Sequence, residues 1–259
     1  MAIARHGPDA FAAMRRAGRL AAEALAAAGA AVRPGVTTAE LDAIVEETIR
    51  AGGGEPATKG MRGFPAAACI SVNHVACHGI PSPAKRLVEG DLVKIAFKAK
   101  LDGWHAGICR TFHAGRPTPR GRLLAERAEQ ALAAGLAVLR PGATLGDLGH
   151  AIQQAAETRV AGVAFAVLRD LGGHGIGREF FTEPHVHHWG RPGEGDVLEE
   201  GMFLSVQPIL VAGKADTKTL PDGWSIVTRN RGWAAQAEHT VGITADGAEV
   251  FTAAPETPC

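Results

Sequence analysis

A short motif that occurs twice divides this chain of 259 residues into two similar parts. Residues Arg33–Thr37 read RPGVT and match residues Arg140–Thr144, which read RPGAT, with every position displaced by 107. A second match occurs in the same order: residues His78–Ile80 and His174–Ile176 both read HGI. Self-similarity of this kind indicates an internal duplication in which two halves face one another. A cleft between the halves is then the natural place for a ligand.

Each half is expected to contain helices followed by strands. Apolar residues at helical spacing predict a helix over residues 8–31, and Thr37–Glu40 offers a capping box for a second helix. Strands are expected at residues 68–72, 92–99, 202–211, 224–228 and 238–244, with further helices at 120–139 and 145–161. The two halves, about residues 10–110 and 120–252, together predict a single domain of the α+β class.

Charge and cysteine content exclude several classes of protein. Lysines and arginines number 27 and so do aspartates and glutamates, a balance that argues against a nucleic-acid or anionic-membrane partner. No apolar run reaches the roughly 18 residues of a membrane span, and residues 1–18 lack the pattern of a secretion signal. The 4 cysteines have no CxxC spacing, so reduced thiols and a cytoplasmic location are expected. Neither a nucleic acid nor a membrane is therefore expected as a partner, and the partner we expect is a small-molecule substrate.

The segment Cys69–Pro81, CISVNHVACHGIP, resembles the active-site entrance of the type I methionine aminopeptidases. Further matches follow in the family's order at Asp102–His105, Gly172–Gly177, Glu183-Pro184, Gly201-Met202, Asp222–Trp224 and Ala235–Thr240. The resemblance extends from about residue 10 to residue 252. It implies the pita-bread fold, a duplicated helix-plus-antiparallel-sheet arrangement around a central cleft.

The resemblance also implies where metal ligands belong, and here the sequence departs from the family. The family holds two divalent metals through two Asp, one His and two Glu, and the metals activate a water for attack on the peptide carbonyl. The matching positions in this chain are Ala96, Gly107, His174, Gln207 and Glu238. Because His174 and Glu238 alone offer too few ligands for two ions, we expect neither a metal nor another cofactor.

Other parts of the family's site persist. His78 occupies the position of the family's general acid or substrate-binding histidine, whereas Phe181 replaces a second pocket histidine. Apolar residues remain at or beside the positions that line the family's methionine pocket: Met61, Phe64, Cys69, Phe180 and Trp224. Packing in the core explains each of these apolar residues equally well.

Strand alternation gives Lys98 a particular position. Successive side chains of a strand point to opposite faces, so Lys98 is expected on the same face as Ala96, toward the cleft. A buried ammonium near Glu238 and His174 would supply positive charge in place of the metals and keep the carboxylate paired. The alternative is that Lys98 extends into solvent from a strand edge.

A rebuilt site for a single metal is a second alternative. His105 and Cys109 share strand parity with Gly107, so either side chain would reach one soft metal together with His174. The histidines within residues 185–188 add imidazoles, but a solvated loop after Glu183-Pro184 explains them more simply.

Three functions follow from these residues. The changed ligands and the added lysine favour an enzyme that is not a peptidase and performs metal-independent acid–base chemistry on a small amino-acid-derived metabolite. Isomerisation, elimination, condensation and cyclisation are the reactions considered for it, with these catalytic residues: His78, Lys98, His174, Gln207 and Glu238. The alternatives are an inactive module that binds a peptide or protein, and a methionine aminopeptidase with a single rebuilt metal site.

Overall fold

The structure is a computed structural model that describes residues 3–159 and 162–253. The first half holds helices α1 (Pro8–Ala30) and α2 (Thr38–Ala51), a short 3-10 helix (Met61–Gly63), and strands β1 (Glu55–Pro56), β2 (Cys69–Val72), β3 (Val75–Cys77), β4 (Leu92–Leu101) and β5 (Trp104–His113). The second half begins with α3 (Pro119–Leu136) and α4 (Leu145–Glu157). Its strands are β6 (Phe165–Val167), β7 (Gly173–Gly175), β8 (Thr182–Val186), β9 (Phe203–Val206), β10 (Ile209–Ala212), β11 (Thr217–Thr219), β12 (Ile226–Thr228), β13 (Ala234–Gln236), β14 (His239–Ile243) and β15 (Ala248–Val250).

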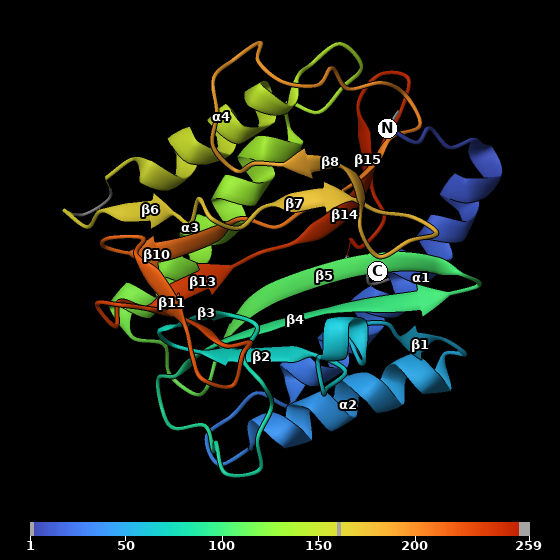
Figure 1. Ribbon diagram of the computed structural model, residues 1–259. Coiled ribbons are helices and arrows are strands. Elements are labelled where there is room, and N and C mark those ends of the chain that lie inside the picture. The colour runs from blue at the N-terminus through green and yellow to red at the C-terminus, as the bar shows by residue number, and fades with distance from the viewer. Residues whose placement is uncertain (1–2, 160–161, 254–259) are drawn as a thin grey trace, which may run out of the picture.

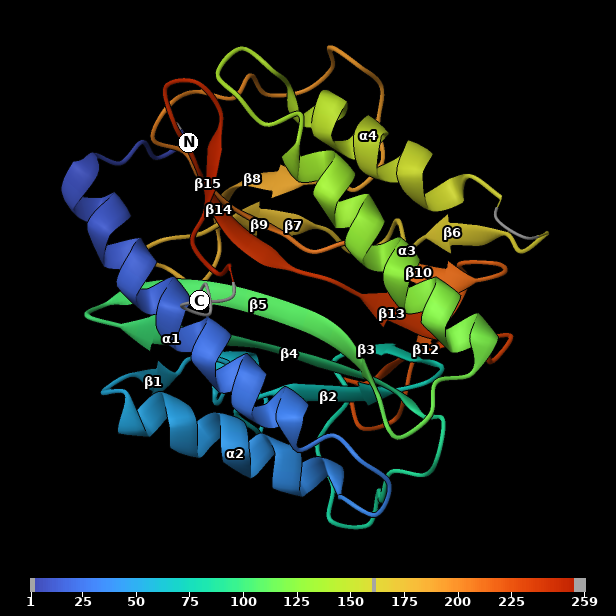
Figure 2. The same cartoon turned by 180° about the vertical axis from the view of Figure 1, so that it is seen from behind.

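The strands pair in an antiparallel manner throughout. In the first half β4 lies between β2 and β5 and also pairs with β1, whereas the largest set of the second half has the order β15-β14-β9-β7-β8. Two smaller sets, β13-β10-β6 and β11-β12-β3, complete the strands, and the second of them joins strands of both halves. Figure 2 shows α1 and α3 crossing the strands on one side, while Figure 1 views the strands from the other side.

Both copies of the repeated motif start a helix in the same way. Thr37 and Glu40 form a capping box at the start of α2, and Thr144 and Asp147 form one at the start of α4. In each box the threonine hydroxyl accepts from the backbone of the acidic residue, and the carboxylate accepts from the threonine amide. The repeated sequence therefore specifies a repeated helix start.

The glycine of the motif also has the same role in both copies. Gly35 and Gly142 have φ angles of 92° and 86°, a left-handed conformation that glycine adopts without steric cost. Their amides donate to the carbonyls of Leu87 and Leu198, at 2.8 and 2.9 Å. The glycine thus forms the same local backbone turn in both copies of the motif.

Two main apolar clusters lie beneath the helices, one formed mostly by residues of the first half and the other mostly by residues of the second. Helix α1 buries residues at helical spacing against β4 and β5, including Met14, Ala17, Ala21 and Ala24, as expected for an amphipathic helix on a sheet. Helices α3 and α4 pack on strands of the second half through a cluster of buried aliphatic side chains. Its members include Leu124, Leu132, Leu148 and Ile152 of the helices and Leu204 and Leu210 of the strands. Each fully buried Leu or Ile contributes about 1.5–3 kcal/mol, so these clusters fix the strands that carry the cleft residues.

The predicted elements are confirmed with local exceptions. The strand expected at 202–211 is interrupted at Gln207-Pro208, which separates β9 from β10. The helix expected at 145–161 ends at Glu157, and residues 160 and 161 lie outside the described part of the chain. No helix among the described residues combines the length and apolarity needed to cross a membrane.

Candidate active site

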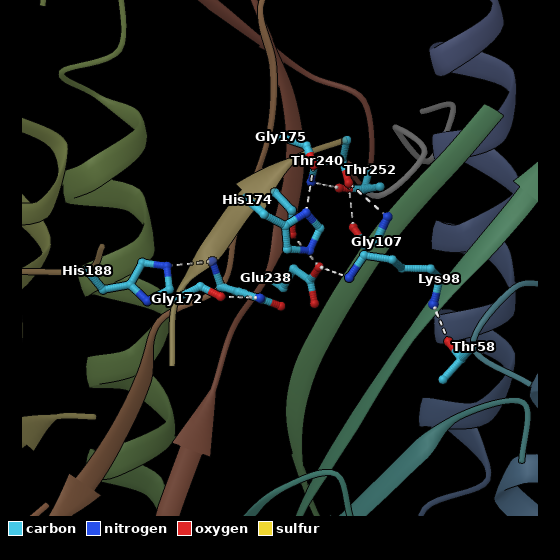
Figure 3. A network of polar contacts seen from close by, with 12 residues as sticks. Thr58, Lys98, Gly107, Gly172, His174, Gly175, His188, Glu238, Thr240 and Thr252 are labelled. Carbon is cyan, nitrogen blue, oxygen red and sulfur yellow. Dashed lines mark hydrogen bonds and ion pairs between the residues drawn. The ribbon is translucent and has the colours of Figure 1, made fainter. Parts of the chain in front are cut away.

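The two halves join at the backbone of β5. The amide of Glu238 donates to the Cys109 carbonyl at 2.9 Å, and the Cys109 amide donates to the Glu238 carbonyl at 3.3 Å. The amide of Gly107 donates to the Thr240 hydroxyl at 2.8 Å, and that hydroxyl donates back to the Gly107 carbonyl at 2.9 Å. Figure 3 shows that this seam lies beside Lys98 and His174.

Lys98 and Glu238 form a buried ion pair at this seam. Lys98 Nζ lies 3.5 Å from Glu238 Oε1, and the two residues are 7% and 2% exposed. The Ser205 hydroxyl donates to the same carboxylate oxygen at 2.7 Å, and the lysine backbone amide donates to the Thr58 hydroxyl at 2.8 Å. The lysine side chain thus points to Glu238 rather than into solvent, as strand alternation predicts, and it compensates a carboxylate that would otherwise be costly to bury.

Gly107 provides the space for this ion pair. It lies opposite Lys98 in the β4–β5 ladder. A Cβ atom at position 107 would overlap Glu238 Oε1 and would lie 3.1 Å from Lys98 Cε. The side chains of Lys98 and Glu238 therefore occupy the volume that an aspartate at this position would need.

His174 approaches the ion pair from β7. Its Nδ1 lies 2.7 Å from the Gly175 carbonyl, an arrangement that fits a proton on Nδ1, while its buried Nε2 has no hydrogen-bond partner among the described residues. Burial and then the charge of Lys98 lower the pKa of His174 to about 3. The imidazole is therefore neutral near pH 7, with the Nε2 lone pair available as an acceptor.

His78 lies where two cavities meet. A small pocket of about 170 Å³ and a cleft of about 730 Å³ share several lining residues, including Arg62, Cys77, His78, Phe181, Gln207 and Gln236. Burial, followed by the charge of Lys98, lowers the pKa of His78, so this imidazole is also neutral near pH 7. It has a φ of 53°, a conformation uncommon for a residue with a side chain.

The small pocket is apolar and aromatic. The residues expected to line it from the resemblance do so: Met61, Phe64, Cys69, Phe180, Phe181 and Trp224. The rings of Phe64 and Trp224 meet edge to face at 5.1 Å, and the ring of Phe180 lies 4.7 Å from Lys98 Nζ. Burial raises the pKa of Cys69 to about 12, so its thiol stays protonated and contributes a weakly polar wall.

Gln207 is held at the cleft by two contacts. Its side-chain amide donates to the Gly172 carbonyl at 2.6 Å, and its backbone amide donates to His188 Nε2 at 3.1 Å. The expectation that residues 185–188 lie solvated on a loop is wrong for His188, which is 1% exposed. It is also wrong for His185, which belongs to β8, although that side chain is exposed. The buried His188 accepts the Gln207 amide at the break between β9 and β10.

The residues of the alternative single-metal site point to other partners. His105 Nδ1 lies 3.1 Å from the Gly177 carbonyl, and Cys109 Sγ lies 3.8 Å from the Gln236 carbonyl. Burial raises the pKa of Cys109 well above its usual value. Across residues 3–159 and 162–253, no three His, Cys, Asp or Glu side chains come together in a way that could hold a metal ion.

Sequence reasoning missed two residues that shape the site. Ser205, which bonds to Glu238, is the one hydroxyl within the apolar strand β9, and that irregularity was the available signal. Arg62 lies 5.0 Å from the centre of the Phe181 ring and lines both cavities. Arg62 has a φ of 48°, and nothing in the sequence indicates this backbone conformation or the position of its side chain.

Comparison with known proteins now defines the class. The model of metallopeptidase family M24 matches residues 12–245, so the chain belongs to that family. It is 42% identical over 257 residues to a methionine aminopeptidase of Rickettsia prowazekii, covering 99% of this chain and 97% of the relative. It is 40% identical over 253 residues to a methionine aminopeptidase of Escherichia coli K12, covering 97% and 94%. The chain is thus a member of the methionine aminopeptidase group within this family.

Solved structures agree with this placement. The crystal structure of the Rickettsia prowazekii methionine aminopeptidase has a TM-score of 0.94, with 42% identity, and covers 97% of this chain and all of its own. The Thermotoga maritima methionine aminopeptidase has a TM-score of 0.93, with 34% identity, and covers 97% and 99%. The predicted pita-bread fold of the α+β class is confirmed.

The comparisons overturn the function expected first from the sequence. A repurposed enzyme with metal-independent acid–base chemistry on a small metabolite is the wrong prediction, because relatives 39–42% identical over nearly the whole chain are named methionine aminopeptidases. The expectation that the chain is not a peptidase is wrong for the same reason. Three changed ligand positions are a weaker indicator of function than similarity over the whole chain.

The family description implies metal ions, but the residues of this site do not fit a pair of them. Of the five matched positions, only His174 and Glu238 carry a ligating imidazole or carboxylate, whereas a catalytic zinc typically has three protein ligands. The Glu238 carboxylate is already paired with the Lys98 ammonium at 3.5 Å. An aspartate at position 107 would collide with that pair. The donor set therefore differs from the one that the resemblance implies.

Proposed function

We propose that this chain is an aminopeptidase-type protein that receives peptides by an amino-terminal methionine. The proposal takes its substrate class from the names of the relatives and its support from the apolar pocket beside His78. Methionine suits this pocket because its thioether is flexible, apolar and favourable against aromatic rings such as Phe64 and Trp224. A lysine side chain would bring a second ammonium close to Lys98 and Arg62, which line the same pocket, and would be repelled there.

The rest of the peptide would lie in the larger cleft. The junction between the two cavities carries His78 and Gln207, which supply hydrogen-bonding groups beside the first peptide bond. Beyond it, the cleft is lined by the carboxylates of Asp170, Glu179 and Glu183. A pocket for one side chain that opens into a wider cleft supports recognition of a chain end rather than of an internal segment.

The site of action is proposed to be the cytoplasm, in line with the expectation from the sequence. The three cysteines in the described part of the chain, Cys69, Cys77 and Cys109, are all free and buried. Reduced thiols are the usual state in that compartment.

The test is discrimination between short peptides that differ only in the first residue. Met-Ala-Ser and Lys-Ala-Ser would be incubated with the purified protein, with and without added manganese or cobalt, while released amino acids are quantified and binding is measured by calorimetry. We expect binding and release to favour the methionine peptide. Equal treatment of both peptides, or no interaction with either, would refute the proposal.

A pocket-filling variant gives the matched control. Cys69→Trp places a large ring in the small pocket, and Cys77→Ser changes a thiol that also lines the cleft without filling the pocket. The first change should abolish the preference for methionine, whereas the second should retain it. Retained preference in Cys69→Trp would show that methionine is recognised elsewhere.

A further inference from the structure

We propose that the Lys98 ammonium replaces the metal ions of the family, both as the counter-ion of Glu238 and as the cation that faces an oxygen of the bound peptide. Family resemblance assigns the metals to the space between Glu238, His174 and positions 96 and 107. In this chain that space holds the lysine side chain. The proposal goes beyond peptide recognition because it states how the site is charged.

The first support is the way in which the carboxylate is satisfied. Glu238 Oε1 accepts the Ser205 hydroxyl at 2.7 Å and lies 3.5 Å from Lys98 Nζ, in surroundings where both charged residues are less than one-tenth exposed. A divalent ion would have to displace the ammonium or lie beside it, and two cations this close repel strongly in a medium of low polarity. Metal and lysine therefore compete for one carboxylate.

The second support is the pattern of small residues around the lysine. Ala96 and Gly107 carry the smallest side chains at the two positions where the family has aspartates. A Cβ at position 107 would already be 3.2 Å from Lys98 Cγ and would overlap Glu238. The Lys98 side chain thus fits beside Glu238 because position 107 has no Cβ atom.

The third support is the direction of the ammonium. Lys98 lines the small pocket, and its separation of 3.5 Å from Glu238 is longer than the roughly 2.7–2.9 Å of a charge-assisted hydrogen bond. The ammonium has three N–H donors, so donors remain for a ligand in the pocket. A peptide whose methionine occupies this pocket brings its first carbonyl oxygen close to the pocket wall, and that oxygen is the acceptor we assign.

The first experiment measures metal binding and does not depend on any substrate. Chelator-treated protein would be titrated with Mn²⁺ by calorimetry, and the ions retained after gel filtration would be counted by elemental analysis. We expect the unaltered protein to bind no Mn²⁺ ion through His174 and Glu238. Uptake of Mn²⁺ by the unaltered protein that His174→Ala or Glu238→Gln abolishes would overturn the proposal.

Restored ligands provide a second arm of the metal experiment. The triple variant Ala96→Asp, Gly107→Asp and Gln207→Glu would be compared with the same variant carrying Lys98→Met in addition, after circular dichroism has shown that both are folded. Removal of the competing ammonium should raise Mn²⁺ affinity by at least about tenfold. Equal affinity of the two variants would show that Lys98 does not occupy the metal position.

The second experiment tests the contact with the peptide oxygen. Lys98→Met would be compared with the unaltered protein for binding of Met-Ala-Ser and of 3-(methylthio)propylamine, which retains the side chain and amine but lacks the carbonyl. We expect about tenfold weaker binding of the peptide and nearly unchanged binding of the amine. Equal losses for both ligands would refute the assigned contact. If neither ligand binds the unaltered protein, the proposed function fails, while the metal experiment still decides the role of the lysine.

Discussion

At the scale of single residues, the site depends on charge compensation between Lys98 and Glu238. Removing one member leaves the other charge buried without its partner, which is more costly than removing both. Each charged side chain therefore stabilises the protein mainly by compensating the buried charge of the other. This asymmetry can be measured without knowledge of the substrate.

We expect Lys98→Met and Glu238→Gln each to lower the free energy of unfolding by about 3–5 kcal/mol. The double variant should be less destabilised than the sum of the two, because no unpaired charge remains. Urea unfolding of the four proteins supplies the complete cycle. Additive losses would contradict a direct interaction between these side chains.

Gly107 allows a second test at this scale. Gly107→Ala should destabilise the protein by about 1–3 kcal/mol, because its new methyl group enters the space of the ion pair. Gly7→Ala serves as the matched control, since no atom lies within 4 Å of a Cβ there. Thermal unfolding of both variants measures the difference. A loss at Gly107 no larger than that at Gly7 would show that the pair adjusts without strain.

The site residues differ in how far the sequence predicts them. The inward direction of Lys98 follows from strand alternation, which is a local property of the backbone. The partnership of Ser205 with Glu238, and the burial of His188 against Gln207, depend on strands distant in the sequence. The ligand positions stay a prediction from the resemblance, and the residue identities at those positions led to the wrong class of reaction.

At the scale of elements, the two helix starts are equivalent parts of the repeated structure. Helices α2 and α4 begin with capping boxes at Thr37 and Thr144. In both boxes the threonine hydroxyl accepts a hydrogen bond from the backbone amide three residues later. Such starts were predictable for α2 because capping is encoded within four residues. The break between β9 and β10 was harder to locate, although Pro208 lacks the amide that a continuous strand requires.

Thr37→Ala and Thr144→Ala should each lower the free energy of unfolding by about 1 kcal/mol, since each removes a helix cap. The corresponding Thr→Ser variants keep the hydroxyl and should recover most of that loss. Chemical unfolding of the four variants checks the expectation. A clearly unequal cost at the two sites would contradict their structural equivalence.

At the scale of the whole molecule, buried neutral histidines limit stability in acid. Burial lowers the pKa of His188 and of His174 to about 3, and that of His239 to about 4. Unfolding exposes these rings, which then bind protons below their usual pKa of 6.5. The unfolded state therefore takes up more protons between pH 6.5 and about 3, and stability is lost as the pH falls through this window.

His188→Gln tests the linkage because glutamine retains an acceptor for the Gln207 amide but does not titrate. The slope of the unfolding free energy against pH reports the number of protons taken up on unfolding. Between about pH 4 and 6 this number should be smaller by about one in the variant. Urea unfolding at several pH values gives the two slopes. The same slope in both proteins would show that His188 is not kept neutral by the fold.

The hydrogen bonds between Gly107 and Thr240 join positions that are 133 residues apart in the sequence. Contacts of such long range require the closure of a long loop, and the entropy cost of that closure slows folding. A ribosome must therefore release most of this polypeptide before Lys98 can meet Glu238. During synthesis, the nascent amino-terminal half carries an ammonium whose counter-charge has not yet been made.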